Sequence, residues 1–226
     1  GALDKEVGIF LNAIGLPTLQ GYGLTEVAGA SHINTIPVPV EKIGAVGKVV
    51  PNTYSKIIDT ETGKELGTNE RGEVLIKGPH VMPGYLNNQE ATEHCIDQEG
   101  WFHTGDIGYA DEDGYFFIVD RVKELIKYKA YQVAPAELEA LLVSHDRIAD
   151  AAVIPSPDEE AGEIPKAFVV LKGQITAEEI MTFVAERVAP HKKIRSLEVV
   201  EEIPKSASGK ILRRVLVEQE RERHKN

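Results

Sequence analysis

Gly100-Trp101-Phe102-His103-Thr104-Gly105-Asp106 is followed after ten residues by Phe117-Ile118-Val119-Asp120-Arg121-Val122-Lys123-Glu124-Leu125-Ile126-Lys127-Tyr128-Lys129, and these two runs decide the fold. The first run predicts a tight turn that ends in a carboxylate. The second brings an Asp-Arg pair and three lysines close behind that turn. A carboxylate can accept hydrogen bonds from a sugar diol, and lysine and arginine can meet phosphate or carboxylate oxygens. The combination favours a nucleotide bound beside a reacting acid.

The composition limits the class of protein. The 226 residues are 42% hydrophobic and 27% charged, which is ordinary for a soluble globular protein of one or two domains. The net charge of −11 argues against nucleic-acid binding, although a basic second half suits a small polyanion. No apolar run approaches the roughly 20 residues that span a bilayer. The single Cys95 excludes an internal disulfide and fits a reducing compartment, so we expect a cytoplasmic protein.

Periodicity in the first half predicts one helix followed by short strands. Residues 4–14 carry apolar side chains at helical spacing, which indicates a helix. Residues 18–20 are predicted to form a short strand that runs into a loop made by Gly21-Tyr22-Gly23. Further strands are expected at residues 46–50, 54–58 and 73–76, and Asp111-Glu112-Asp113-Gly114 predicts a hairpin turn.

After Asp120 the pattern changes to mixed helices and strands. The expected helices are residues 135–143, a helix after the capping box Thr176-Ala177-Glu178-Glu179, and residues 211–223. The expected strands are residues 150–154, 167–171 and 197–200. This second part is therefore predicted to be a small α+β unit, with the boundary near Asp120-Arg121-Val122.

Three motifs in order carry a resemblance to a known family. They are Gln20-Gly21-Tyr22-Gly23-Leu24-Thr25-Glu26, the runs quoted first, and Pro204-Lys205-Ser206-Ala207-Ser208-Gly209-Lys210. Together they resemble the adenylate-forming enzymes, which include acyl-CoA ligases, 4-coumarate-CoA ligases, insect luciferases and peptide-synthetase adenylation domains. The run from Asp120 to Glu139 resembles the 4-coumarate-CoA ligase and luciferase branch most.

The resemblance implies an α/β and α+β fold in two domains. Residues 1–120 would be the C-terminal part of a large N-terminal domain, with 1–40 ending an α/β subdomain and 41–120 forming a β-barrel-like subdomain. Residues 121–226 would be a small, mobile C-terminal α+β domain. The chain has no stretch like the family's Thr-Ser-Gly-Thr-Thr-Gly phosphate loop. We therefore expect a C-terminal portion whose partner is the missing N-terminal part of the same enzyme.

The activity that the resemblance implies is that of a carboxylate–CoA ligase. A small-molecule carboxylic acid would react with ATP, in the presence of Mg²⁺, to give acyl-AMP and pyrophosphate, and CoA would then displace AMP. One alternative is a luciferase-like monooxygenase that shares the adenylation step. A second alternative is a non-catalytic AMP- or CoA-binding fragment.

The resemblance also assigns the nucleotide side of the site. Tyr22 and Gly23 would border the adenine, Thr25 would contact phosphate, and Glu26 would bind Mg²⁺. Asp106 would accept both ribose hydroxyls, and Arg121 and Gln132 would lie near the nucleotide. The competing interpretations are structural: a partly buried tyrosine in a strand-turn, and an aspartate that merely caps a turn.

The remaining assignments concern catalysis and domain rotation. Lys210 would serve adenylation, and Lys127 would serve the thioester step. Asp120 and Lys123 would form the hinge, unless this segment is an ordinary interdomain ion-pair cluster. Gly29 and Ala30 would border the acyl pocket, and Lys129 and Ala130 would line the CoA path. Ala130 stands where the family usually has glycine, so its methyl group could narrow that path or strain the turn.

Overall fold

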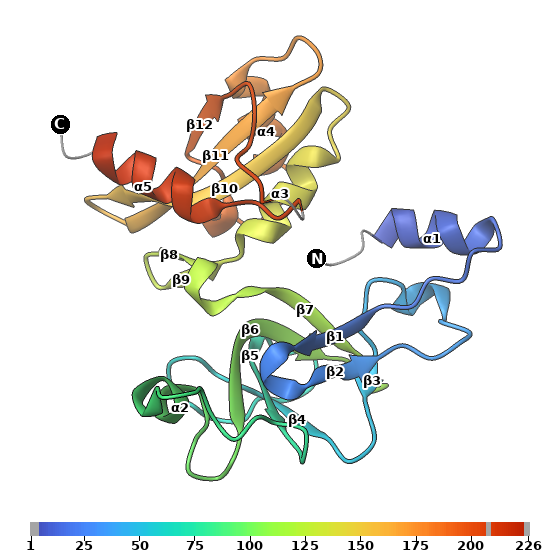
Figure 1. The fold of residues 1–226 in the computed structure, drawn as a ribbon. Coiled ribbons are helices and arrows are strands. Elements are labelled where there is room, and N and C mark those ends of the chain that lie inside the picture. The colour runs from blue at the N-terminus through green and yellow to red at the C-terminus, as the bar shows by residue number, and fades with distance from the viewer. Residues whose placement is uncertain (1–4, 207–208, 224–226) are drawn as a thin grey trace. The chain divides into compact units, whose positions relative to one another are not determined.

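The computed structural model describes residues 5–206 and 209–223. The chain forms two compact units that divide between Val122 and Lys123, two residues beyond the boundary used above. Each unit has its own sheets (Figure 1). Each unit also has its own hydrophobic core. None of the described helices is long and apolar enough to cross a bilayer.

The first unit is built mainly from antiparallel strands. Its elements are α1 (Lys5–Ala13), β1 (Gly21–Leu24), the 3₁₀ helix η1 (Thr25–Val27), β2 (Gly29–Ile33), the 3₁₀ helix η2 (Val40–Lys42), β3 (Lys48–Val49), β4 (Tyr54–Ile58), β5 (Gly72–Lys77), α2 (Gln89–Cys95), β6 (Phe102–Ala110) and β7 (Phe116–Arg121). Strands β1-β2-β3 make one sheet and β4-β5-β6-β7 make another. Among the described residues both sheets are open, so the expected barrel-like part is a meander and not a closed cylinder.

The core of the first unit lies between its strands. It contains Val27, Val46, Ile57, Val74, Ile76, Phe102 and Phe116, all of them buried. By contrast, α1 and the segment after it leave large apolar side chains exposed, among them Phe10 at 61%, Ile14 at 55% and Leu16 at 57%. The helix predicted over residues 4–14 is present as Lys5–Ala13, but the described residues leave Val7 and Phe10 on it and Ile14 after it exposed.

Two sequence-based predictions in this unit are wrong. The glycine motif is not a loop after a strand at 18–20, because Gly21–Leu24 is itself strand β1 and pairs with β2. Residues Thr104–Asp106 are not a tight turn, because they lie inside strand β6. The hairpin turn at residues 111–114 is confirmed, with Gly114 at φ 78° and its amide donating to the Asp111 carbonyl oxygen at 3.0 Å.

The second unit is a mixed sheet covered by helices. Its elements are η3 (Val122–Glu124, which begins at the division), β8 (Ile126–Tyr128), β9 (Tyr131–Val133), α3 (Pro135–Val143), β10 (Ile148–Asp158), β11 (Gly162–Leu171), α4 (Ala177–Ala185), η4 (Pro190–Lys192), β12 (Ser196–Val199) and α5 (Arg213–Arg223). The strand order is β10-β11-β8-β9, and β12 pairs in parallel with β11.

Both faces of the sheet in the second unit are buried, because successive side chains of a strand point to opposite faces. Ala151 and Val153 of β10 point into a core that also contains Leu138 of α3 and Ile180 of α4. The intervening residues, among them Ile154, pack in a second core with Leu216 of α5, Phe168 and Ile203. Helices α3 and α4 therefore cover one face, and α5 covers the other.

Several local predictions in the second unit are confirmed. Helix α3 spans residues 135–143, and Thr176 and Glu179 form the reciprocal capping box. Strands β10 and β11 are longer than predicted and continue through Pro155 and Pro165, which pair with each other. Pro155 is tolerated because β10 is the edge strand of its sheet.

Candidate functional site

A tyrosine, an aspartate and an arginine from three strands meet in the first unit. The Tyr22 hydroxyl, on β1, donates to Oδ2 of Asp106 at 2.6 Å. The Nε atom of Arg121, at the end of β7, lies 3.3 Å from the other oxygen, Oδ1. Asp106 and Arg121 are direct cross-strand partners. The structure therefore brings together three of the residues that the sequence assigned to the nucleotide.

A bulge in β6 places Asp106 in this position. Glu73 pairs with Ile107, whereas Leu75 pairs with His103, so Thr104, Gly105 and Asp106 face a single residue of β5. Gly105 has a φ of 69°, a value that glycine adopts readily.

The bulge is held by side chains. Thr104 Oγ1 donates to the Val74 carbonyl oxygen at 2.7 Å and accepts from the Asp106 amide at 3.1 Å. The Gly105 amide donates to Oε1 of Glu73 at 3.0 Å. Glu73 was missed by the sequence analysis, because a glutamate in a strand predicts solvent exposure and not support for a bulge.

Burial controls the charge state of this cluster. Asp106 is only 5% exposed, and this burial raises its pKa, while the hydrogen bond from Tyr22 and the charge of Arg121 act in the opposite direction. Burial and the neighbouring Asp106 charge raise the pKa of Tyr22, so its hydroxyl stays protonated as a donor. A carboxylate has about four acceptor positions. Asp106 can therefore hold Tyr22 and Arg121 and still accept hydroxyl groups of a ligand.

Glu26 lies in η1, which follows directly after β1, and its neighbour Thr25 is exposed. The Tyr85 hydroxyl donates to Glu26 Oε1 at 2.8 Å, which raises the pKa of Tyr85 to about 12. The Met82 amide donates to the Glu26 carbonyl oxygen at 2.7 Å and fixes the backbone.

The surroundings of Glu26 fit one carboxylate ligand of a magnesium ion. In the described part of the chain no three His, Cys, Asp or Glu side chains could hold a metal by themselves. A carboxylate that shares Mg²⁺ with substrate phosphates and water needs no such cluster. Tyr85 was missed by the sequence analysis, because it lies 59 residues from Glu26 along the chain.

The residues assigned to the acyl pocket lie beside the glycine motif. Ala30 pairs with Gly23 and Gly29 pairs with Leu24, and Gly23, Gly29 and Ala30 are all exposed. Gly23 permits this pairing, because a Cβ atom there would lie 1.7 Å from the Gly29 carbonyl oxygen.

A buried histidine lies behind Tyr22. His32, on β2, pairs with Tyr22, and their ring centroids are 5.7 Å apart. Its ring also packs on Phe116 at 4.4 Å, and Nδ1 lies 3.0 Å from Ser31 Oγ. Its Nε2 atom has no hydrogen-bond partner among the described residues. No motif of the sequence marks His32.

In the second unit, Lys127 and Gln132 are cross-strand partners on the β8–β9 hairpin. The turn of this hairpin is Lys129-Ala130, and Lys129 carries the left-handed conformation, with φ 53°. Lys129 Nζ lies 2.7 Å from Glu160 Oε1. Ala130 is exposed and is not among the residues with positive φ, so the turn places no backbone strain on it.

Lys210 lies on a separate loop of the second unit. The motif residues Ala207 and Ser208 fall outside the described residues. The Lys210 amide lies 3.2 Å from Ser206 Oγ, and its carbonyl oxygen accepts from the Ser206 amide at 2.8 Å. The Lys210 side chain is exposed.

The two residues assigned to the hinge stand on either side of the division between the units. Asp120 is buried in β7 and accepts a hydrogen bond from the Arg121 amide at 2.8 Å. Lys123 is exposed in η3 and begins the second unit. The site residues therefore form one cluster in the first unit and two groups, on the hairpin and on the loop, in the second.

Comparison with known proteins identifies the family. The family models for AMP-binding enzyme and AMP-binding enzyme C-terminal domain match residues 1–86 and 137–210. The 4-coumarate–CoA ligase of Pinus taeda is 56% identical over 201 residues, which cover 87% of this chain and 37% of that protein. The chain thus spans less than half of this relative.

Two further proteins agree. The 4-coumarate–CoA ligase 1 of Glycine max is 52% identical over 204 residues, which cover 87% of this chain and 69% of that protein. The structure of o-succinylbenzoate CoA synthetase from Bacillus subtilis, in complex with an acyl-adenylate intermediate, matches with a TM-score of 0.87 and 33% identity, over 96% of this chain and 44% of that one. The chain belongs to the adenylate-forming, AMP-binding enzymes, in the branch that contains the 4-coumarate–CoA ligases.

Proposed function

We propose that this chain is part of an AMP-forming carboxylate–CoA ligase. In the first half-reaction a carboxylate oxygen attacks the α-phosphorus of ATP, the bond to the β-phosphate breaks, and acyl-AMP and pyrophosphate form. In the second, the CoA sulfur attacks the acyl carbon and AMP leaves. The observation that carries the proposal is the Tyr22–Asp106–Arg121 cluster, which suits a ribose with its phosphate nearby.

The buried carboxylate of Asp106 is the centre of nucleotide binding. Its free acceptor positions can take the two ribose hydroxyls, because charge-assisted hydrogen bonds to a carboxylate are strong. Tyr22 holds the carboxylate in one orientation and offers a ring face to the adenine. Arg121, with a side chain that is 62% exposed, can meet the phosphate side while it pairs with Asp106.

Glu26 is the residue that would hold Mg²⁺ together with the phosphates of ATP. When bound, Mg²⁺ neutralises charge on the phosphates as pyrophosphate leaves. Tyr85 keeps one carboxylate oxygen of Glu26 in place, and the Met82 amide keeps its backbone in place. The exposed hydroxyl of Thr25 lies next to Glu26 and can donate to a phosphate oxygen.

The two lysines would serve different half-reactions. Lys210, on an exposed loop, can bring an ammonium group to the acid and the α-phosphate, where it would stabilise the charge that develops in adenylation. Lys127, on the β8–β9 hairpin beside Gln132, would act in the thioester step. The similarity of the Pro204–Lys210 and Lys127–Gln132 segments to those of the family supports this division.

ATP–pyrophosphate exchange tests the function. We expect the complete polypeptide that contains this chain to exchange pyrophosphate with one class of acid. The panel should hold aromatic, short-chain and long-chain acids, and 4-coumarate should come first because related enzymes are named for it. Nucleotide binding without exchange for any acid would contradict the proposal and favour a non-catalytic module.

Separate half-reactions test the two lysines. Lys210→Ala should abolish pyrophosphate exchange and leave thioester formation from supplied acyl-AMP within about twofold of the parent. Lys127→Ala should do the reverse. Equal losses of both half-reactions in either variant would contradict the division of labour.

A further inference from the structure

The first residue of α5 makes a forked ion pair inside the second unit. Arg213 Nε lies 3.2 Å from Glu139 Oε1, and Nη2 pairs with Glu139 Oε2. A third nitrogen, Nη1, pairs with Glu124 Oε2. The Arg213 side chain is only 17% exposed. A two-point contact of this kind fixes orientation as well as position, because the guanidinium plane and the carboxylate must align.

Both carboxylates belong to elements that are themselves fixed. Glu139, on α3, is buried and accepts a hydrogen bond from the Val153 amide of β10 at 2.8 Å. Glu124 lies in η3, three residues before Lys127. The side chain of Arg213 therefore joins the start of α5 to α3, to β10 through Glu139, and to the segment that leads into the β8–β9 hairpin.

The backbone on the other side of Arg213 carries Lys210. The Leu212 amide donates to the Pro204 carbonyl oxygen at 2.8 Å, and Lys205 and Ile211 form a bridge that closes the loop. At the far side of the loop, Lys205 Nζ lies 2.6 Å from Asp150 Oδ2 of β10. The base of the Lys210 loop is thus tied to the unit at Lys205 and at Arg213.

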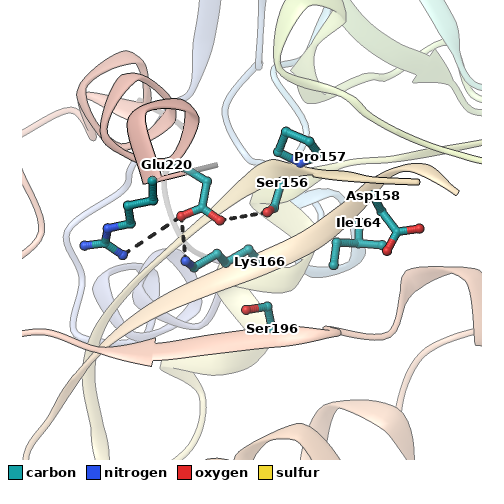
Figure 2. Close-up of a pocket in the computed structure, with 8 residues that line it drawn as sticks. Ser156, Pro157, Asp158, Ile164, Lys166, Ser196 and Glu220 are labelled. Carbon is teal, nitrogen blue, oxygen red and sulfur yellow. Dashed lines mark hydrogen bonds and ion pairs between the residues drawn. The ribbon is translucent and has the colours of Figure 1, made fainter. Parts of the chain in front are cut away.

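The opposite end of α5 has a separate attachment. Glu220 accepts hydrogen bonds from Ser156 Oγ at 2.7 Å and from Lys166 Nζ at 2.6 Å (Figure 2). Glu220 is 3% exposed, and Leu216 of the same helix is also buried. Loss of the fork at Arg213 would therefore loosen the start of α5 and the loop, while the rest of the helix stays on the sheet.

We propose that Arg213 is a positioning residue, which sets the Lys210 loop for adenylation through its fork to Glu139. This rests on the ligase function proposed above. An ammonium group stabilises a transition state only when it is held close to its productive position, and a displacement of about 1 Å can cost on the order of a hundredfold in rate. The Arg213 side chain is engaged by Glu139 and Glu124, so its effect should appear in kcat for adenylation and not in KM for ATP.

The test is Arg213→Lys, with Arg214→Lys as the matched control. Lysine keeps the charge and loses the fork. Arg214 is the next residue, its side chain is 88% exposed, and it pairs with Glu218 one turn along the helix. In the complete polypeptide, R213K should lower kcat for pyrophosphate exchange about tenfold or more. Thioester formation from supplied acyl-AMP should stay within about twofold, because the Lys127 backbone keeps its pairing with Gln132 and the hydrogen bond of its amide to Glu163. R214K should leave both within about twofold.

Equal losses of both half-reactions in R213K, or no loss in either, would overturn the proposal. A second readout does not depend on ligase activity. The amides of Lys210 and Leu212 should exchange hydrogen faster in R213K than in R214K, because their acceptors lie within the loop. Unchanged hydrogen exchange of these two amides in R213K would also overturn the proposal. A parent protein without pyrophosphate exchange would instead contradict the ligase function, and hydrogen exchange would still report on the fork.

Discussion

His32 should make the stability of the first unit depend on pH in the mildly acidic range. The ring is fully buried between Tyr22 and Phe116, and this burial lowers the pKa of His32 from its ordinary value of 6.5 to about 4. Ser31 Oγ, near Nδ1, is neutral and does not compensate a charge. The folded chain therefore binds the proton less readily than the unfolded chain.

The sign and the size of the effect follow from this difference. Between pH 6.5 and pH 4 the unfolded chain takes up a proton at His32 and the folded chain does not, so the free energy of unfolding falls as the pH falls. A shift from 6.5 to about 4 corresponds to a loss of about 2 kcal/mol between pH 7 and pH 5. Below the folded pKa the loss reaches its limit of about 3 kcal/mol.

Urea unfolding at a series of pH values measures this effect. Trp101 is the single tryptophan of the chain, and it lies in the first unit, so its fluorescence reports on that unit. His32→Gln removes the group that titrates. The difference in the free energy of unfolding between this variant and the parent should change by about 2 kcal/mol between pH 7 and pH 5. The raised pKa of Asp106 acts in the opposite direction in both proteins and cancels in this difference.

A matched variant controls for the loss of any histidine. His94 is exposed on α2, and His94→Gln should keep the pH dependence of the parent. If the free energy of unfolding of His32→Gln changed with pH in parallel with that of the parent across this range, the reasoning would be refuted. The buried neutral ring would then contribute nothing to the pH dependence of stability.

Three other changes have definite expected outcomes. Gly23→Ala should destabilise the first unit by about 3 kcal/mol or more, measured by tryptophan fluorescence, because its Cβ would collide with a carbonyl oxygen of β2. Tyr22→Phe should raise the KM for ATP about fivefold or more and move the acidic limb of kcat/KM to higher pH, because its hydrogen bond lowers the pKa of Asp106. An unchanged profile would contradict this. Lys166→Met should cost about 3 kcal/mol in thermal unfolding followed by circular dichroism, because buried Glu220 would lose its near cation and keep Arg223 only at 4.0 Å. A change below about 1 kcal/mol would argue against a role of the Lys166–Glu220 pair in stability.

The sequence correctly predicted those elements whose boundaries are determined by residues close together along the chain. Pro135 at the first turn gave the start of α3, and Thr176 with Glu179 gave the cap of α4. Strand β4 coincides with the predicted residues 54–58, because β-branched and aromatic residues there are bounded by turn residues. The prediction of the turn at Gly114 was correct for a similar reason, since glycine tolerates positive φ.

Where the prediction failed, the deciding contacts come from another strand. Gly105 has the positive φ that either a tight turn or a bulge could use. The bulge forms because Glu73 and Val74, about thirty residues earlier, offer acceptors to Gly105 and Thr104. Sequence spacing around Asp106 holds no information about those partners.

The same limit applies to the candidate site. The motifs marked Tyr22 and Asp106, but their hydrogen bond joins residues 84 positions apart. Glu73, Tyr85 and His32 support the site without belonging to any motif, so only the fold could identify them. The roles of Lys127 and Lys210 rest on resemblance, because each lysine lies on an exposed element and would act only with substrate bound.

The uncovered apolar side chains near the start of the chain have a practical consequence. Phe10 of α1, together with Ile14 and Leu16 just beyond the helix, presents large apolar side chains to water within seven residues of sequence. Surfaces of this kind bind one another and bind hydrophobic dyes. The chain expressed by itself should therefore self-associate as its concentration rises and should increase the fluorescence of an anilinonaphthalene dye. Replacing Phe10 and Ile14 with lysine would improve the yield of dispersed protein without touching any of the three hydrophobic cores.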